Sequence, residues 1–240
     1  MKIYNSRIDY GAELHKDIIY LTAGVDVQAN RLELEVVGWG KGQRSYGVLY
    51  TVIQGTPGEK RTWDKLEKIL KREFNYESKR EKLKIAITLI DSGHATNEVY
   101  NFVHGKEQEN IFAIKGIGGE GKSPINGFNT THKEGCLPIN LLSLGVNALK
   151  DTTYFRLDLE QGSGQCFFPL ESGYNSHDYF KGLTAEVKKL QETNKGKKLS
   201  WEIIPGRKRN EPLDIRNYAT AGMIFIENTE QLLKEEEEDV

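Results

Sequence analysis

The sequence predicts a mixed α/β fold in which three antiparallel strands precede parallel strands and helices flank the sheet. An apolar strand over residues 20–28 is followed, after a short connection, by the alternating segment 31–39, which is typical of a β-hairpin. The continuous apolar run over residues 84–91 is typical of a central parallel strand that is covered on both faces. Helical periodicity between the later strands completes the α/β pattern.

The other elements follow in chain order. A turn at 40–43 leads to a third strand over 45–53, and the break at 55–58 ends that strand. An amphipathic helix follows, with apolar residues at helical spacing at Trp63, Leu66, Ile69, Leu70 and Phe74. Beyond the central strand we expect a helix over 96–104, a strand over 111–115, a loop over 116–135, a strand or helix start within 138–158, a short apolar segment over 165–169, a helix over 178–192, a strand over 199–204 and a helix over 210–228.

This order is the connectivity of the ribonuclease H-like fold, whose first strand, fourth strand and late helix bring carboxylates together. We therefore expect one ribonuclease H-like domain over residues 20–228, with a loop-rich insertion at about 116–175. Residues 1–19 have no clear period and form a lead-in. The acidic segment 229–240 is expected to be a disordered tail.

Composition narrows the class of protein. A chain of 240 residues is long enough for one sizeable core. Its apolar runs all fall short of the ~20 residues that span a bilayer, and its polar N-terminus does not resemble a signal peptide. The two cysteines, Cys136 and Cys166, lack a metal-ligand spacing. These features favour a reduced, intracellular setting without a membrane partner.

The formal net charge of −2 argues by itself against a nucleic-acid-binding protein. However, residues 235–239 carry five negative charges, so the rest of the chain has a formal charge of +3. Basic residues also cluster at 188–189, 195–198 and 207–209. Such clusters are commonly solvated faces, and Arg207, Lys208 and Arg209 are the candidates for contact with a phosphate backbone.

Three aspartates are the main candidates for a functional site. Asp26 and Asp91 each end an apolar strand, and Asp214 lies at the start of the last helix. Taken singly, the first two could cap strand ends and the third could complement the helix dipole. A carboxylate at the end of a buried strand is costly unless a positive charge compensates it, so the three together predict one shared cation site.

Carboxylate oxygens suit hard divalent ions, and phosphodiester hydrolysis uses two such ions about 4 Å apart. The expected cofactors are therefore two ions of Mg²⁺ or Mn²⁺. Asp26, on a central strand, would bridge them, Asp91 would hold one ion, and Asp214 the other. Glu211 precedes Asp214 by three residues and is a possible fourth ligand or a group that orients water. Pro212 suits the first helical turn, and Asn210 suits the N-cap.

Six segments carry a resemblance to a known family. They are Leu21-Thr22-Ala23-Gly24-Val25-Asp26-Val27-Gln28, Gly38-Trp39-Gly40, Ile90-Asp91-Ser92-Gly93, Val99-Tyr100, Phe112-Ala113-Ile114-Lys115-Gly116 and Asn210-Glu211-Pro212-Leu213-Asp214. In this order, over about residues 20–228, they resemble the nuclease domain of lambda-like (GpA-type) tailed-phage terminase large subunits. Asp26, Asp91 and Asp214 match the acidic positions of that family, which usually has a small residue where this chain has His94.

The resemblance implies a divalent-metal-dependent endonuclease that cuts concatemeric double-stranded DNA during phage genome packaging. It also implies partners in the full-length protein: an ATPase motor domain, a small terminase subunit and a portal. Residues 1–19 would be the linker from that ATPase domain, and the protein would act in the host cytoplasm. We expect little sequence preference from the nuclease domain alone.

The segment Gly116 to Ser123 satisfies the phosphate-loop pattern and follows a predicted strand. A working phosphate loop needs a helix directly after it, whereas Pro124 and Gly127 give no helical period here. Lys122 is then a candidate DNA-phosphate contact, and Lys115 is a candidate cation near the metal site or an ordinary edge lysine. Two alternatives to a nuclease remain: a nucleotide-binding module that uses this loop, and a non-catalytic ribonuclease H-like scaffold that docks DNA.

Overall fold

The computed structural model describes residues 2–77, 82–193 and 196–238. Its main sheet is built from β1 (Ile18–Gln28), β2 (Arg31–Gly40), β3 (Arg44–Gln54), β6 (Ile85–Asp91), β7 (Ile111–Ile117), β8 (Ile125–Thr131), β9 (Ile139–Gly145) and β10 (Cys166–Phe167). These eight strands lie in the order β10-β3-β2-β1-β6-β7-β9-β8. Two short ladders are separate from it: β4 (Phe74–Asn75) with β5 (Lys82–Leu83), and β11 (Glu186–Thr193) with β12 (Gly196–Ile203).

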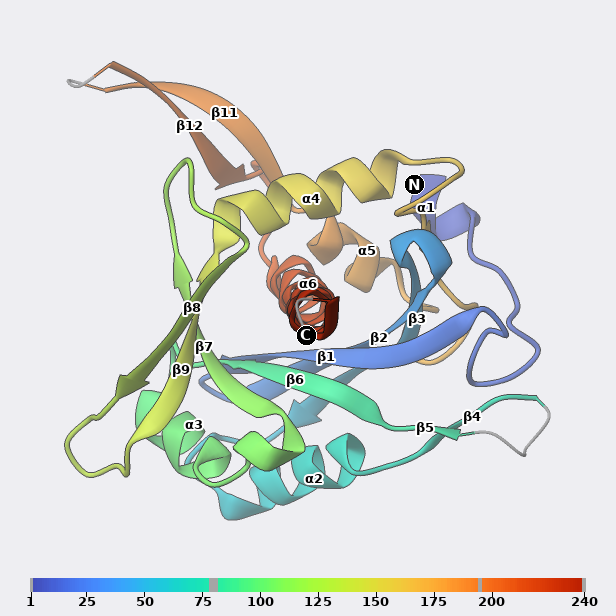
Figure 1. Ribbon diagram of the computed structural model, residues 1–240. Coiled ribbons are helices and arrows are strands. Elements are labelled where there is room, and N and C mark those ends of the chain that lie inside the picture. Colours follow the sequence, from blue (N-terminus) through green and yellow to red (C-terminus); the bar gives the residue numbers. More distant parts are fainter. Residues whose placement is uncertain (1, 78–81, 194–195, 239–240) are drawn as a thin grey trace.

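Helices cover both faces of this sheet (Figure 1). On one face lie α2 (Lys60–Leu70) and α3 (Thr96–Val103), and on the other lie α4 (Val146–Asp158), α5 (His177–Leu183) and α6 (Glu211–Glu238). The chain also has a short α1 (Lys2–Asn5) and 3-10 turns at Lys41–Gln43 and Glu107–Glu109. Among the described residues, no helix has the length and apolarity that a membrane crossing requires.

Strand directions confirm the expected ribonuclease H-like order. β1 is antiparallel to β2, and β2 is antiparallel to β3. On its other side β1 is parallel to β6, and β6, β7 and β9 continue in parallel. β1 is therefore an interior strand, with buried residues on both faces.

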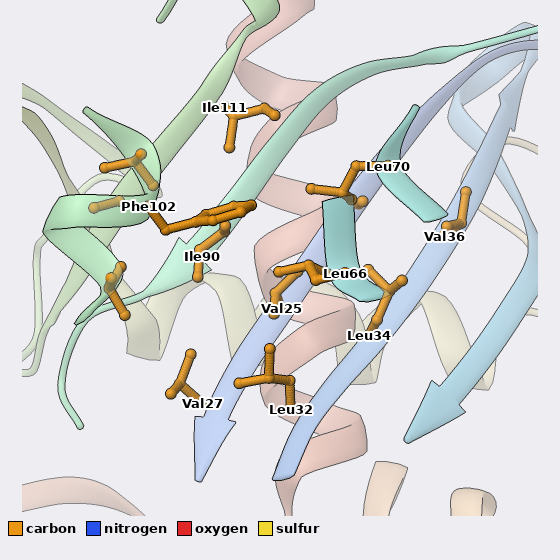
Figure 2. Packing of buried hydrophobic residues seen from close by; sticks show 14 of the residues in the cluster. Val25, Val27, Leu32, Leu34, Val36, Leu66, Leu70, Ile90, Phe102 and Ile111 are labelled. Carbon is orange, nitrogen blue, oxygen red and sulfur yellow. The ribbon is translucent and has the colours of Figure 1, made fainter. Parts of the chain in front are cut away.

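The two faces of β1 have different partners. Val25 and Val27 pack with Leu34, Leu66 and Phe102 in the core between the sheet and helices α2 and α3 (Figure 2). On the opposite face, Thr22, Gly24 and Asp26 lie toward α6, since side chains alternate along a strand. This alternation places Asp26 on the face that α6 covers.

Helix α6 lies unusually close to β1 because glycine occupies the contact point. A Cβ atom on Gly24 would stand 2.0 Å from the carbonyl oxygen of Ile215. Thr22 Oγ1 donates a 2.7 Å hydrogen bond to the carbonyl of Ala219 and accepts one of 2.8 Å from Trp39 Nε1. The helix is thereby fixed in register on the strand, and Asp214, the residue before Ile215, is brought to the end of β1.

One predicted helix is wrong. Residues 178–192 were expected to be helical, but α5 ends at Leu183 and β11 begins at Glu186. The segment Glu186-Val-Lys-Lys-Leu-Gln-Glu is rich in good helix formers, so its local propensity favours a helix. Antiparallel pairing with β12 along the whole segment overrides that propensity. The resulting hairpin, β11–β12, projects from the body of the molecule (Figure 1).

The loop predicted over 116–135 contains a strand instead. β8 pairs antiparallel with β9 at the edge of the sheet, where Phe128 packs on Phe112 and Phe225 with ring centroids 5.0 and 5.7 Å away. The segment 116–175 thus holds β8, β9, α4 and β10 rather than mainly loop. Since β8 follows Ser123 and Pro124, the helix N-terminus that a phosphate loop requires is replaced by a strand.

Two helix boundaries also differ from expectation. The helix containing Trp63 ends at Leu70, and Phe74 lies in β4. Helix α6 continues to Glu238 through most of the acidic segment that was expected to be disordered, and residues 239–240 lie outside the described chain.

We expect Gly24→Ala to lower the free energy of unfolding by about 3 kcal/mol, because the added methyl group must push α6 away from β1. Urea denaturation of the variant and the parent measures this loss. The control is Gly58→Ala, since a Cβ at Gly58 meets no atom within 4 Å. Equal stability of Gly24→Ala and the parent would contradict the close approach of α6.

Candidate functional site

The topology brings the three predicted aspartates to one end of the sheet. Val25 pairs in parallel with Ile90, so Asp26 and Asp91 are the next residues on two neighbouring strands. Asp214 comes from the first turn of α6, which rests on β1. All three carboxylates raise the pKa of the buried Tyr218 phenol, one turn after Asp214, in addition to the effect of burial. The pairing of β1 with β6 and the packing of α6 on β1 thus place the three aspartates at the same end of the sheet.

Asp26 is only 5% exposed. Its Oδ2 accepts a 2.5 Å hydrogen bond from Gln28 Nε2. Burial raises the pKa of Asp26 to about 7, against the opposing effect of Gln28, and the charges of Asp91 and Glu211 raise it further. This carboxylate therefore carries an uncompensated desolvation cost when it is ionised.

Asp91 is the last residue of β6 and lies beside the turn that follows this strand. Burial raises the pKa of Asp91, whereas the backbone N–H groups of Gly93 and Ser92, followed by the charge of His94, oppose that rise. A Cβ atom on Gly93 would lie 3.0 Å from Asp91 Oδ2, so glycine leaves room for the carboxylate. Ser92 Oγ donates a 2.7 Å hydrogen bond to the carbonyl of Ile114, which ties this turn to β7.

Asp214 is held at the start of α6. The carbonyl of Asn210 accepts hydrogen bonds from the N–H groups of Leu213 and Asp214, so Asn210 occupies the predicted N-cap position. Its side-chain amide donates to Asp214 Oδ2 at 3.0 Å. Burial raises the pKa of Asp214 to about 7, and Lys150 lowers it while Asp26, Glu186 and Asp91 raise it.

Glutamates near the aspartates form ion pairs with basic residues. Glu33 is fully buried and accepts hydrogen bonds from Arg31, Arg209 and Tyr50. The predicted fourth acidic residue, Glu211, accepts from Arg31 Nη2 at 2.6 Å and from Arg209 Nε at 3.3 Å. Both oxygens of Glu211 are thus engaged by arginines.

The three aspartates differ from these glutamates, because none of them has an ion-pair partner among the residues that the structure describes. The described residues likewise contain no three acidic, histidine or cysteine side chains that already stand as a set of metal ligands. Gln28 donates to one oxygen of Asp26, and Asn210 donates to one oxygen of Asp214. Carboxylate oxygens without an ion-pair partner are the donor set that a hard divalent cation fits.

The predicted basic residues are not all near this centre. Lys115 follows Ile114, which pairs with Asp91, so strand alternation points Lys115 to the opposite face of the sheet. Lys122 is exposed on the connection between β7 and β8. Arg207, Lys208 and Arg209 line a cavity of about 290 Å³ with Lys181, directly before α6. Of these five predicted DNA contacts, Arg209 is the one bound to the glutamates beside Asp26.

Sequence reasoning missed Glu33, Arg31, Lys150 and Glu186. Glu33 could have been predicted, because the tight β1–β2 connection pairs Gln28 with Arg31 and therefore Asp26 with Glu33. Lys150 and Glu186 come from α4 and β11, and no local pattern marks them. Their 2.7 Å ion pair depends on how α4 packs against the base of the hairpin.

In metal-free buffer at pH 8, we expect Asp26→Asn and Asp214→Asn to raise the melting temperature by about 2–4 °C each, or about 1 kcal/mol. Burial raises the pKa of both carboxyls from 3.8 to about 7, so the folded chain retains protons that the unfolded chain releases between pH 4 and 7. The free energy of unfolding therefore falls as the pH rises through that window. The Asn side chain of each variant does not ionise there, so the variants avoid this loss of stability. Thermal scans from pH 4 to 8 measure the effect.

The control for these scans is Asp64→Asn, which removes a solvent-exposed partner of Lys60 and should change the melting temperature little. Variants at Asp26 and Asp214 that are less stable than the parent at pH 8 would contradict the uncompensated burial of these carboxylates.

Comparison with known proteins assigns the chain to a family. The sequence model of the protein family described as the terminase large subunit gpA, endonuclease domain, matches residues 4–233 of this chain. The chain is 27% identical over 227 residues to the large terminase subunit of Enterobacteria phage P21, covering 90% of this chain and 34% of that protein. It is 27% identical over 224 residues to the large terminase subunit of Escherichia phage lambda, covering 89% and 33% respectively. No solved structure matches.

The chain thus spans about a third of the length of these relatives. The family match covers nearly all of the described fold, including the strands and the helix that carry the three aspartates. The chain belongs to the family of endonuclease domains of the terminase large subunit gpA.

Proposed function

We propose that this chain is a divalent-metal-dependent endonuclease that hydrolyses phosphodiester bonds of double-stranded DNA. In the phage it would cut concatemeric DNA during genome packaging. The observation that carries this proposal is the placement of three aspartates without an ion-pair partner, one buried and two half-buried, at one end of the sheet in a member of an endonuclease-domain family. Membership supports the reaction class, and the uncompensated carboxylates support the metal dependence.

Asp26, Asp91 and Asp214 would hold two ions of Mg²⁺ or Mn²⁺, with Asp26 shared because its strand contacts both β6 and α6. When bound, these ions would activate a water molecule and stabilise the leaving oxygen. We assign the direct metal contacts to the three aspartates. Glu211, whose oxygens accept from Arg31 and Arg209, would act as a charged neighbour rather than as a fourth ligand.

The protein groups around the aspartates would supply orientation. Gln28 fixes one oxygen of Asp26, and Asn210 fixes one oxygen of Asp214. The N–H groups of Gly93 and Ser92 favour the charged form of Asp91. Because Asp214 lies in the first turn of α6, the helix dipole also favours its charged form.

The DNA backbone would approach over the basic segment before α6. Arg207 and Lys208 are the candidates for phosphate contact there, since Arg209 is committed to Glu33 and Glu211. Lys122 would be a peripheral contact. In the longer protein we propose that an ATPase motor domain, a small terminase subunit and a portal are the partners, and that the protein acts in the host cytoplasm.

We expect the purified chain to nick or linearise plasmid DNA when Mg²⁺ or Mn²⁺ is present and to lose this activity with EDTA. Asp91→Ala should reduce the rate at least 100-fold, because it removes a direct metal ligand. The control is Asp64→Ala in α2, the helix on the opposite face of the sheet (Figure 1), which should leave the rate unchanged. Gel assays of supercoiled plasmid measure both.

Cleavage by Asp91→Ala at the parental rate would overturn the assignment of this site. Metal binding without cleavage by the parent would favour the alternative of a DNA-docking scaffold. Strong cutting at one DNA sequence would contradict the expected lack of sequence preference.

We expect the double variant Arg207→Ala/Lys208→Ala to weaken DNA binding and to reduce the slope of log affinity against log salt by about 2, while single-turnover cleavage at saturating DNA is unchanged. Each lost phosphate contact removes about one released counterion. Fluorescence anisotropy at several salt concentrations measures the slope. Lys68→Ala, on α2 across the sheet, is the control, and an unaltered slope in the double variant would place the DNA elsewhere.

A further inference from the structure

We propose that Lys150, Glu186 and Asn210 are positioning residues that set the orientation of the Asp214 carboxylate for metal binding. This inference rests on the proposed function, because it assigns a role to residues around the same site. It adds three residues from three elements: α4, β11 and the residue that precedes α6.

The contacts form a continuous chain that ends on Asp214. Lys150 Nζ lies 2.8 and 2.7 Å from the two carboxylate oxygens of Glu186. Asn210 Nδ2 donates to Glu186 Oε1 at 2.8 Å and to Asp214 Oδ2 at 3.0 Å. An amide nitrogen has two hydrogens, so the two bonds use its full donor capacity. The amide thereby holds two carboxylates at once.

Burial makes this arrangement rigid. Glu186 has a side chain that is 4% exposed, and that of Lys150 is 13% exposed. The backbone of Glu186 is fixed as well, since its N–H donates to Tyr154 Oη at 3.0 Å and its carbonyl accepts from the same hydroxyl at 2.6 Å. A carboxylate anchored at both its side chain and its backbone gives the Asn210 amide a fixed partner. The other carboxylate oxygen of Asp214, Oδ1, is then left in a defined direction.

Lys150 also balances the negative charge of Glu186. Glu186 places a negative charge beside Asp214, which would repel that carboxylate if nothing offset it. Lys150 supplies the offsetting positive charge, so the pair presents its hydrogen-bonding geometry without adding net charge to the site. A glutamate alone at this position would attract a cation to itself and away from Asp214.

The structure contains a matched ion pair for comparison. Lys188 Nζ lies 2.8 Å from Asp151, and this pair also joins β11 to α4. Its side chains are 34% and 46% exposed, and it makes no contact with Asn210 or Asp214 among the bonds of the described residues. Breaking it tests whether loss of any α4–β11 ion pair affects the site.

The experiment measures Mn²⁺ binding by electron paramagnetic resonance in the absence of DNA, alongside plasmid cleavage and thermal unfolding. Asn210→Ala and Lys150→Met should each weaken Mn²⁺ affinity about 10- to 100-fold, as is typical when a partner of a metal ligand is removed. Lys150→Arg, which keeps the charge, should recover most of the affinity. Lys188→Met should bind Mn²⁺ like the parent, with a melting temperature close to that of Lys150→Arg.

Saturating Mn²⁺ should restore much of the cleavage rate of Asn210→Ala, because the variant loses ligand orientation and keeps its ligands. Mn²⁺ affinity within twofold of the parent in both Asn210→Ala and Lys150→Met would overturn this inference and leave the proposed function standing. Absence of Mn²⁺ binding by the parent would overturn the proposed function and this inference with it. Unchanged Mn²⁺ binding in Asp26→Ala would do the same.

Discussion

The contact between α6 and β1 is the constraint on which the rest of the site depends. Gly24 allows the backbone of α6 to reach the strand, and Thr22 fixes the register of the helix through the carbonyl of Ala219. Asp214 is then carried to the end of β1, beside Asp26, and parallel pairing with β6 adds Asp91. A residue with a side chain at position 24 would move the helix and with it one of the three carboxylates.

Electrostatic pairing separates the acidic residues at this end of the sheet into two groups. Glu33, Glu211 and Glu186 are each engaged by arginine or lysine, so their charges are compensated within the fold. Asp26 is buried and Asp91 and Asp214 are half-buried, none with such a partner among the described residues, and partial or full burial raises the pKa of each. The fold thus tolerates a local loss of stability where a cation would bind. The paired glutamates would serve to hold the surrounding elements in place.

Much of this arrangement was predictable from the sequence, for definite physical reasons. Strands β1, β2, β3 and β6 are buried, so alternation and apolar runs reveal them, and their order predicted where Asp26, Asp91 and Asp214 belong. Strand β11 and the edge strand β8 lack a buried face of regular period, and only pairing to a neighbour makes them strands. Lys150 and Glu186 were beyond sequence reasoning, because their ion pair arises from the packing of α4 against β11.

The proposed site requires that the three aspartates together hold divalent metal. Anomalous diffraction from a crystal soaked in Mn²⁺ tests it most directly, since Mn²⁺ scatters anomalously whereas protein oxygen does not. We expect anomalous density between Asp26, Asp91 and Asp214, with oxygens of all three carboxylates within coordination distance. Full occupancy of Mn²⁺ elsewhere on the protein, with no density among these three residues, would contradict it.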